Sequence, residues 1–327
     1  MTVKVIQGIK PFNHFFYKSC FYNALFPVLE WMNRSIYPHI TNDIILYNQN
    51  IQTPGMLEMV YHNFRDPEQI FVEENYKINT CHRKDDIVNE LIQAINLNNP
   101  VIIWLDCYFE NIRSDMYLNE HWAHTILIIG YNDATQQFAI MEHLNKDSLN
   151  YELKWISFDS LKQAYNGFFD LKHSEENPIS YYEFFYQSED ENYSWVGRFE
   201  DNIINHQHLY EKGIIQLEQY SRWLKDVCRD PDHLVQFIEP IFSSLNQIVT
   251  AKQVECARYF YFDQNQERLQ LIGNLLEEWK SIRIIWGKYY FSSVYSYDRI
   301  SISIDGINRI LEMEKKLVCI NERKPIL

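Results

Sequence analysis

No run of apolar residues in this chain of 327 reaches the roughly 18 that a helix needs to cross a bilayer. The N-terminus lacks the apolar stretch of a signal peptide, and the six cysteines (20, 81, 107, 228, 256 and 319) include no CxxC pair and no cluster. Scattered cysteines without a secretion signal argue against a disulfide scaffold. We therefore expect a cytoplasmic protein with reduced thiols and no membrane partner.

An excess of positive charge is also lacking, since 44 acidic residues outnumber 30 Lys and Arg and give a net charge of -14. Nucleic-acid recognition needs a basic face, so no nucleic-acid partner is expected. Residues 250–327 hold 12 basic and 10 acidic residues, a balance of +2, which leaves 18 against 34, or -16, for the rest. An acidic partner would meet least repulsion in this last quarter, where we select Arg283, Lys288, Lys315 and Lys316. The alternative is a mixed, solvated helix surface.

Glycine is scarce, at 9 residues, and no glycine-rich phosphate loop occurs, which excludes the common nucleotide-binding classes. The HExxH pattern of zinc peptidases is also missing. Apolar material is abundant instead: 46% of the residues are hydrophobic, with 23 Tyr and 20 Phe, enough for a sizeable core. Neither a metal nor a dedicated cofactor is expected.

Hydrophobic periodicity predicts mixed helices and strands in the first part of the chain. Residues 20–32 are expected to form a buried helix. Turns at Tyr37-Pro38 and Thr53–Gly55 follow, and then a polar segment that extends to about residue 80. A helix over 85–97 would be capped by Asp85 or Asp86. Further expected elements are strands over 101–105, 125–131, 137–142 and 181–186 and a short helix over 157–167.

From about residue 195 the sequence consists of long stretches in which apolar residues recur with a 3.6-residue period. They predict helices over 203–228, 232–262, 265–291 and 300–318. The acidic segment 187–194 is the expected boundary. The predicted fold class is α+β, with one domain over 1–190 and a mainly helical domain over 191–327.

Two reactive residue types open buried elements about a hundred residues apart. Cys20 begins the first helix, where the helix dipole and free amide donors favour a thiolate. His124 enters the apolar strand that follows it, where it would be held rigidly as a general base. Either residue alone is more often structural. Together, and in this order, they indicate nucleophilic catalysis.

The residues around this pair resemble a known family. A cysteine that opens a helix is followed by Leu105-Asp-Cys-Tyr108 after a buried strand, by His121-Trp-Ala-His124, by Ile-Leu-Ile-Ile-Gly-Tyr131, and by a second strand that ends in an acid. This order resembles the N-terminal domain of the butirosin biosynthesis protein H family over about residues 10–165. It is more distantly similar to bacteriocin-processing cysteine peptidases. The resemblance implies a papain-like cysteine-enzyme domain, followed by a helical domain that often accompanies it.

The function that the resemblance implies is acyl transfer in the biosynthesis of a specialised metabolite such as an antibiotic or nonribosomal peptide. The donor would be an acyl group bound through phosphopantetheine to an acyl or peptidyl carrier protein. The acceptor would be the amine or hydroxyl of a small molecule. No other cofactor is implied.

The resemblance also assigns roles in the site. Cys20 would be the nucleophile and His124 the base, while Glu142, at the end of the second strand, stands where the family usually has Asp as the orienting acid. Asp133 is the lesser rival for that acid. In the oxyanion position, where papain-like enzymes often have Gln, this chain offers His14 or Asn13.

Four further residues are expected near the substrate, and each has an alternative structural role. Aromatic side chains would line a desolvated site, although each could equally be core, and the acid could bind an amine or stabilise a loop. The four are Tyr17, Asp106, Tyr108 and Trp122. Metal ligation by His121, His124, Cys107 and His143 is the weaker interpretation, because positions three apart on a strand face opposite ways.

Three other functions remain open at this stage. A peptidase or amidase of the same fold would use the same residues, and so would a cyclase that releases a chain from its carrier. A binding module that keeps the fold without catalysis is the third alternative, and it predicts that Cys20 reacts no faster than a free thiol.

Overall fold

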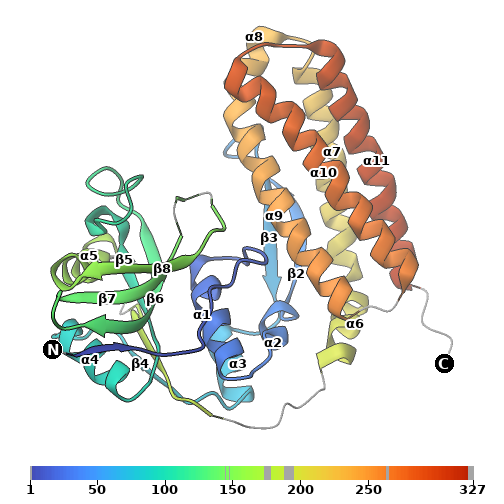
Figure 1. Cartoon of the computed structure of the whole chain (residues 1–327). Helices are drawn as coiled ribbons and strands as arrows, with labels where there is room; N and C mark the ends of the chain where they lie inside the picture. The colour runs from blue at the N-terminus through green and yellow to red at the C-terminus, as the bar shows by residue number, and fades with distance from the viewer. Residues whose placement is uncertain are drawn as a thin grey trace. The chain divides into compact units, whose positions relative to one another are not determined.

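The computed structural model describes residues 2–143, 145–146, 148–172, 178–187, 195–262 and 265–322. The chain divides into two compact units. The first unit contains residues 1–39 and 66–192, and the second contains 40–65 and 193–327. The fold is therefore mixed α+β, with a sheet in the first unit and a helical second unit (Figure 1).

A seven-stranded sheet forms the centre of the first unit, and every neighbouring pair in it is antiparallel. The strand order is β4-β9-β5-β6-β7-β8, and β1 also pairs with β6. The strands are β1 (Val3–Val5), β4 (Ile78–Cys81), β5 (Val101–Asp106), β6 (Ala123–Asn132), β7 (Gln137–Glu142), β8 (Glu152–Ser157) and β9 (Tyr181–Phe184).

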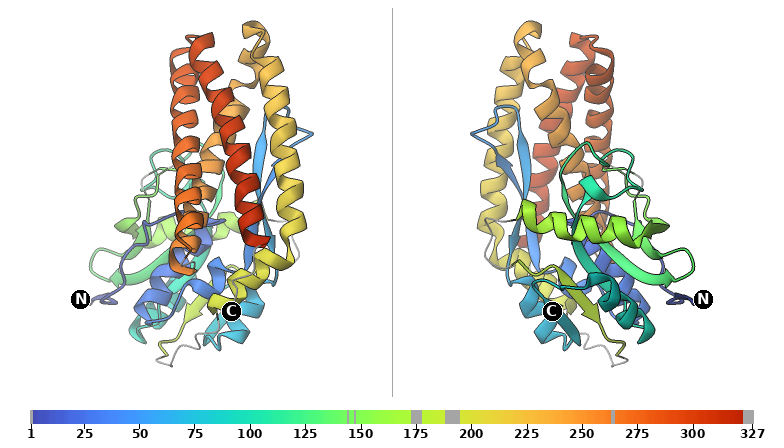
Figure 2. Two further views of the ribbon diagram at one scale, coloured as in Figure 1. Left: turned by 90° about the vertical axis from the view of Figure 1, so that its right-hand side faces the viewer. Right: turned by 90° about the vertical axis from the view of Figure 1, so that its left-hand side faces the viewer.

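Helices pack on both faces of this sheet. Leu105 of β5 lies opposite His124 of β6, so the two side chains share one face, and this is the face whose histidine interacts with the first residue of α1 (Cys20–Trp31). The neighbouring Trp104 points to the other face, where its ring stacks on Phe168 of α5 (Phe158–Leu171). Figure 2 shows α5 across this second face.

The first unit contains three more α-helices, α2 (Tyr37–Ile40), α3 (Pro67–Glu73) and α4 (Ile87–Asn96), and α2 reaches one residue into the second unit. Asp86 caps α4 by accepting a hydrogen bond from the Asn89 amide. A short 3-10 helix, η1 (Cys107–Phe109), follows β5 and is capped by Asp106. The loop from there to β6 carries part of the site described below.

Long helices make up most of the second unit and run side by side in Figures 1 and 2. The helices are α6 (Trp195–Asn205), α7 (Gln207–Val227), α8 (Pro231–Leu234), the 3-10 helix η2 (Val235–Phe237), α9 (Ile238–Phe262), α10 (Gln266–Ser292) and α11 (Tyr297–Glu322). A hairpin of β2 (Asp43–Gln49) and β3 (Leu57–Asn63) packs against α7 and α9.

Buried polar contacts bind this hairpin to the helices. The Tyr47 hydroxyl donates to Glu314 at 2.6 Å and accepts a hydrogen bond from the Trp279 indole at 3.1 Å. Arg258 forms a buried ion pair with Asp43 at the start of β2. The hairpin therefore belongs to the core of the helical unit, although it lies far from the helices in the sequence.

The structure confirms most of the expected elements and corrects two. The predicted segments 20–32, 101–105, 125–131, 137–142 and 181–186 correspond to α1, β5, β6, β7 and β9. The segment before residue 80 that was expected to be polar and without elements contains the β2–β3 hairpin and the start of β4. Tyr37-Pro38 begins the short helix α2 instead of a turn. Most of the expected boundary, residues 188–194, lies outside the described residues. No helix within the described ranges is long and apolar enough to cross a membrane.

Candidate active site

Cys20 is the first residue of α1, and its side chain is 7% exposed. Ser19 before it has an extended backbone, with φ of -153°, so the helix begins sharply at the cysteine. The Asn23 side chain donates to the carbonyl of Phe15 at 3.1 Å and thereby fixes the segment that enters the helix. The thiol therefore sits at the positive end of a buried helix, as the sequence predicts.

His124 lies near the start of β6 and is fully buried. Its Nε2 is 3.0 and 3.2 Å from the two carboxylate oxygens of Glu142. Its Nδ1 has no hydrogen-bond partner among the described residues, and the charges of the imidazole and the Cys20 thiol shift each other's pKa. The ring thus contacts the acid through Nε2 and is electrostatically coupled to the cysteine.

The three groups shift one another's protonation. Burial raises the pKa of the Cys20 thiol, but the positive charge of His124, with smaller contributions from Thr125, lowers the pKa below its ordinary value. Burial alone would lower the pKa of His124, yet the negative charges of Glu142 and Cys20 raise it well above its ordinary value. Both directions favour a thiolate beside an imidazolium.

Glu142 ends β7 and is fully buried. Its carboxylate accepts hydrogen bonds from the backbone amide of His143 at 2.8 Å and from Arg113 Nη1 at 3.0 Å, in addition to its contact with His124. Burial raises its pKa, and the positive charge of His124 outweighs this and lowers the pKa. The structure therefore brings the expected orienting acid to the histidine.

Asp133, the rival acid, lies in the turn that joins β6 to β7, at the end of β6 away from His124. There it accepts a hydrogen bond from Gln136 within the same turn. The Asp133 alternative is wrong because the hairpin places its turn at the opposite end from the histidine.

A buried arginine supports the acid from behind and was not found by the sequence reasoning. Arg113 is fully buried in the loop before β6, and its Nε and Nη2 form two bonds of 2.9 Å with the two carboxylate oxygens of Asp115. Its Nη1 contacts Glu142 and, at 2.9 Å, His143 Nε2. No residue pattern in the loop signalled this role, because one arginine in a polar segment is ordinarily a surface residue.

A second carboxyl, Glu110, was missed in the same loop. It is fully buried, and neither of its oxygens has a nitrogen or oxygen partner among the described residues. Burial, reinforced by the charge of Glu142, raises its pKa to about 8. It also faces Cys107, whose pKa is raised by burial and by Glu110. Cys107 is therefore a thiol of the opposite character to Cys20.

The two residues predicted for the oxyanion position have different environments. The Asn13 side chain donates to the Tyr151 carbonyl at 2.9 Å and accepts from the Tyr151 amide at 2.8 Å, so it joins the segment before α1 to the segment before β8. His14 is exposed and lies with its ring edge against Phe12, at 5.1 Å between centroids. Their role toward an oxyanion stays a prediction.

Of the predicted lining residues, Trp122 lies directly against His124. Its ring stacks on the imidazole of His124, at 4.8 Å between centroids and 17° between planes. Tyr17 is a core residue instead, because it is fully buried and its hydroxyl donates to the carbonyl of His39 at 2.8 Å. A role for Tyr17 toward a substrate stays a prediction.

Asp106 and Tyr108 both contact His121. Asp106 accepts hydrogen bonds from the amides of Tyr108 and Trp122, both at 3.1 Å, and its other oxygen is 2.6 Å from His121 Nδ1. Tyr108 stacks on His121 at 4.1 Å. Asp106 thus stabilises the loop, which is the structural role considered for it, and a role for Tyr108 toward a substrate stays a prediction.

Three buried groups could in principle hold a metal: His124, Glu142 and His143 offer ligand atoms within 4.8 Å of one another. The Arg113 guanidinium, however, contacts both Glu142 and His143. A positive group therefore already balances the carboxylate at this point. The expected set that included His121 and Cys107 is not brought together in this group.

Comparison of the sequence with models of protein families and with curated proteins finds no match to either.

Proposed function

We propose that this protein is a cysteine-dependent acyltransferase with a papain-like catalytic unit, in which Cys20, His124 and Glu142 form the catalytic site. The observation that carries the proposal is the position of His124. Its Nε2 contacts Glu142 at 3.0 Å, while the same ring interacts with a buried thiol at a helix N-terminus. A structural histidine has no need of a thiol whose pKa is lowered or an acid held by an arginine.

In the first step, the Cys20 thiolate attacks the carbonyl carbon of a thioester. A carbon–sulfur bond to Cys20 forms, the carbon–sulfur bond to the donor thiol breaks, and the imidazolium of His124 supplies the proton that the leaving thiolate takes. One activated acyl group replaces another, so the step needs little driving force. A donor bound to an acyl or peptidyl carrier protein through phosphopantetheine fits this chemistry.

In the second step, an amine or hydroxyl of a small molecule attacks the acyl-enzyme. The new carbon–nitrogen or carbon–oxygen bond forms as the bond to Cys20 breaks, His124 takes the proton of the acceptor, and the thiolate is restored. Proton transfer by a positioned histidine contributes about 10²–10⁴-fold in rate. Glu142 holds the ring and stabilises the imidazolium formed at this point.

All six cysteines are free in the structure, and the proposal places the protein in the cytoplasm, where a nucleophilic thiol stays reduced. An amidase or peptidase and a chain-releasing cyclase would form the same acyl-enzyme. They differ from the transferase in what attacks the acyl-enzyme. In an amidase or peptidase the attacking group is water, and in a cyclase it is a nucleophile of the bound acyl chain.

The test is to form the acyl-enzyme with an aminoacyl thioester of N-acetylcysteamine and to follow it by intact-protein mass spectrometry. We expect an acyl adduct on Cys20 that persists in water and is converted to an amide when an acceptor amine is added. Rapid hydrolysis with no dependence on amine would replace the transferase with a hydrolase. Absence of any adduct would leave a binding module.

A further inference from the structure

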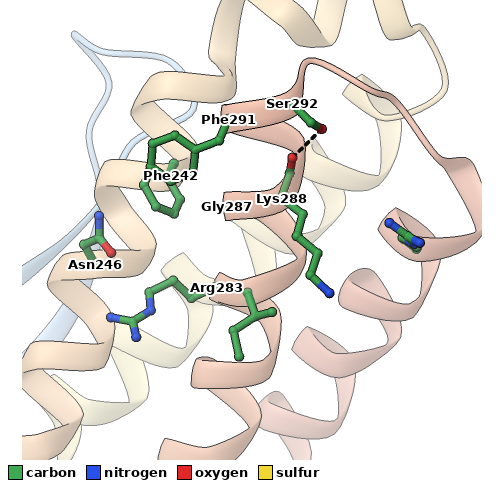
Figure 3. Close-up of a pocket in the computed structure, with 9 residues that line it drawn as sticks. Phe242, Asn246, Arg283, Gly287, Lys288, Phe291 and Ser292 are labelled. Atoms are coloured by element: carbon green, nitrogen blue, oxygen red, sulfur yellow. Dashed lines mark hydrogen bonds between the residues drawn. The ribbon is translucent and has the colours of Figure 1, made fainter.

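A groove of about 700 Å³ crosses α9, α10 and the start of α11 in the helical unit (Figure 3). Three of its lining residues are apolar and three are basic: Phe242, Ile284 and Phe291, and Arg283, Lys288 and Arg299. In Figure 3, Phe242 extends from α9 toward α10, and Arg283, Lys288 and Phe291 belong to α10.

The apolar part of the groove is built from aromatic contacts. The Phe242 ring stacks on Tyr290 at 4.9 Å and meets Phe291 edge-on at 5.6 Å. Gly287 allows this approach, because a Cβ there would lie 3.1 Å from the Phe242 ring. Phe291 is nevertheless 79% exposed and Ile284 55% exposed. Adjacent exposed apolar side chains with a polar rim are typical of interaction surfaces.

The basic residues of the groove differ from the other cations of the same helices. Lys280, Lys315 and Lys316 form ion pairs with Glu277, Glu218 and Glu267, at 2.6–2.9 Å. The further cations Lys252, Arg258 and Arg309 are paired as well.

By contrast, the structure shows no ion pair for Arg283, Lys288 or Arg299 within its described ranges. In a chain with net charge -14, three unpaired cations gathered at one groove indicate an anionic partner. Of the four basic residues selected from the sequence, Arg283 and Lys288 line this groove, whereas Lys315 and Lys316 form ion pairs with Glu218 and Glu267.

We propose that this groove docks an acidic, amphipathic helix of a partner protein. The apolar side chains of that helix pack on Phe242, Ile284 and Phe291, and its carboxylates pair with Arg283, Lys288 and Arg299. A protein fits better than an enclosed small molecule, because Phe291, the more exposed of the two phenylalanines of the groove, lies open on the surface. A groove lined by apolar anchors receives such a helix through residues spaced three and four apart.

This inference goes beyond the proposed function and does not depend on the chemistry at Cys20. The test therefore uses the full-length Cys20→Ala protein as well as the native one, so that a failure of catalysis and a failure of docking are distinguishable. Both proteins carry the photo-crosslinking residue p-benzoylphenylalanine in place of Phe291. The matched control carries it in place of Phe260, an equally exposed phenylalanine of α9 at 74%.

Crosslinking is done in the cells that make the protein, and the crosslinked peptide is sequenced by mass spectrometry. We expect the Phe291 position, in both backgrounds, to capture an acidic helical segment of one protein that the Phe260 position does not capture. Capture of a lipid, of a second copy of this chain, of a segment without acidic residues, or of nothing would overturn the proposal.

Affinity for the captured protein, purified, provides the second measurement. The double variant Arg283→Glu/Lys288→Glu should weaken binding at least tenfold and reduce its salt dependence, because two attractive charges become repulsive. Lys316→Glu, which makes the same type of change outside the groove, should remain within about twofold of native. Equal effects of the two changes would show that the groove is not the docking surface.

Discussion

At the scale of single residues, the molecule contains two buried thiols with opposite tendencies in the same unit. Cys20, at a helix start beside an imidazole, has a lowered pKa, whereas Cys107, beside the buried carboxyl of Glu110, has a raised one. Burial is shared by the two residues, so it cannot be what activates Cys20. The difference comes from the charge of the nearest ionisable group.

Cys20→Ala should abolish acyl-enzyme formation and remove the rapidly alkylated thiol, while leaving the melting temperature within a few degrees of native. Ala is well tolerated at a helix start. The measurement is the rate of iodoacetamide labelling of each cysteine, read by peptide mass spectrometry, with Cys107→Ala as the control that should change nothing. His124→Ala should reduce labelling of Cys20 to the rate of an ordinary thiol. Rapid labelling that survives in Cys20→Ala would assign the nucleophile to another cysteine.

Glu142→Gln should slow acyl transfer by about 10–100-fold without abolishing it, because Gln keeps the shape but loses the charge that stabilises the imidazolium. Arg113→Met should lower the rate in the same direction, since it removes the cation that holds Glu142 ionised and oriented. Single-turnover rates with a thioester donor measure both changes. If Glu142→Gln acts at native rate, the acid is only structural.

A pH dependence follows from Glu110, whose pKa rises from its ordinary 4.5 to about 8 in the fold. The contribution of this group to stability is complete below pH 4.5 and is lost as the pH rises through 8. Between these values the carboxyl is still protonated in the folded protein but already ionised in the unfolded chain. Glu110→Gln should therefore increase the unfolding free energy at pH 8–9 by on the order of a few kcal/mol, which raises the melting temperature there. Near pH 5 the substitution should have little effect. Parallel melting curves against pH for the two proteins would contradict this.

At the scale of elements, one antiparallel hairpin brings His124 and Glu142 together. In the register of β6 and β7, Leu127 pairs with Met141, so Glu142 continues along β7 on the His124 face of the sheet. A histidine near the start of one strand and an acid at the end of the next must then meet. This part of the site was predictable from the sequence, because alternation and the intervening turn determine the hairpin.

The supporting groups were not predictable in the same way. Arg113 and Glu110 lie in the irregular loop between β5 and β6, where no periodicity indicates which side chains point inward. The core packing of Tyr17 could not be predicted for a related reason, since an aromatic residue before a helix is compatible with either the core or a site. Local patterns establish the elements, and only the packed fold determines which loop residues face the acid.

The sheet itself offers a test at Gly130, where β1 pairs with β6 and Val5 lies opposite the glycine. A Cβ at this position would lie 2.5 Å from the Lys4 carbonyl oxygen and 2.8 Å from the Val5 side chain. Gly130→Ala should therefore destabilise the protein by about 1–3 kcal/mol, the usual cost of overpacking. Gly273→Ala is the matched control, because nothing lies within 4 Å of its added Cβ, and it should be neutral or slightly stabilising. Both are measured by urea unfolding, and equal effects would mean that β1 does not pack as described.

At the scale of the whole molecule, the two units interleave in the sequence. The hairpin of residues 40–65 interrupts the first unit and contributes Tyr47 and Asp43 to the core of the helices. The chain enters the second unit at residue 40, returns to the first at 66 and enters the second again at 193, whereas the sequence predicts a single division at 190. The hairpin was missed because its partner helices lie more than a hundred residues later, so its sequence alone looks too polar for a core strand.

A fragment of residues 1–192 should consequently expose the apolar face of the hairpin and bind the dye ANS strongly. Replacing residues 40–65 in that fragment by a short Gly/Ser linker should restore a folded, ANS-silent protein. Such a linker is feasible because the ends of the hairpin are adjacent, with the Phe64 amide 2.9 Å from the Asn42 carbonyl oxygen. A fragment that is folded and ANS-silent with its hairpin intact would contradict the assignment of the hairpin to the helical core.

The central claim is that Cys20, activated by His124, carries an acyl group from donor to acceptor, and trapping that group tests it most directly. The native protein, Cys20→Ala and His124→Ala are mixed with an aminoacyl thioester, and intact masses are recorded before and after addition of an acceptor amine. The account predicts one acyl adduct on native protein, assigned to Cys20 by peptide mapping, stable in water and lost as an amide product once amine is present. It predicts no adduct on Cys20→Ala and a much slower one on His124→Ala. An adduct that forms equally on all three proteins would contradict it.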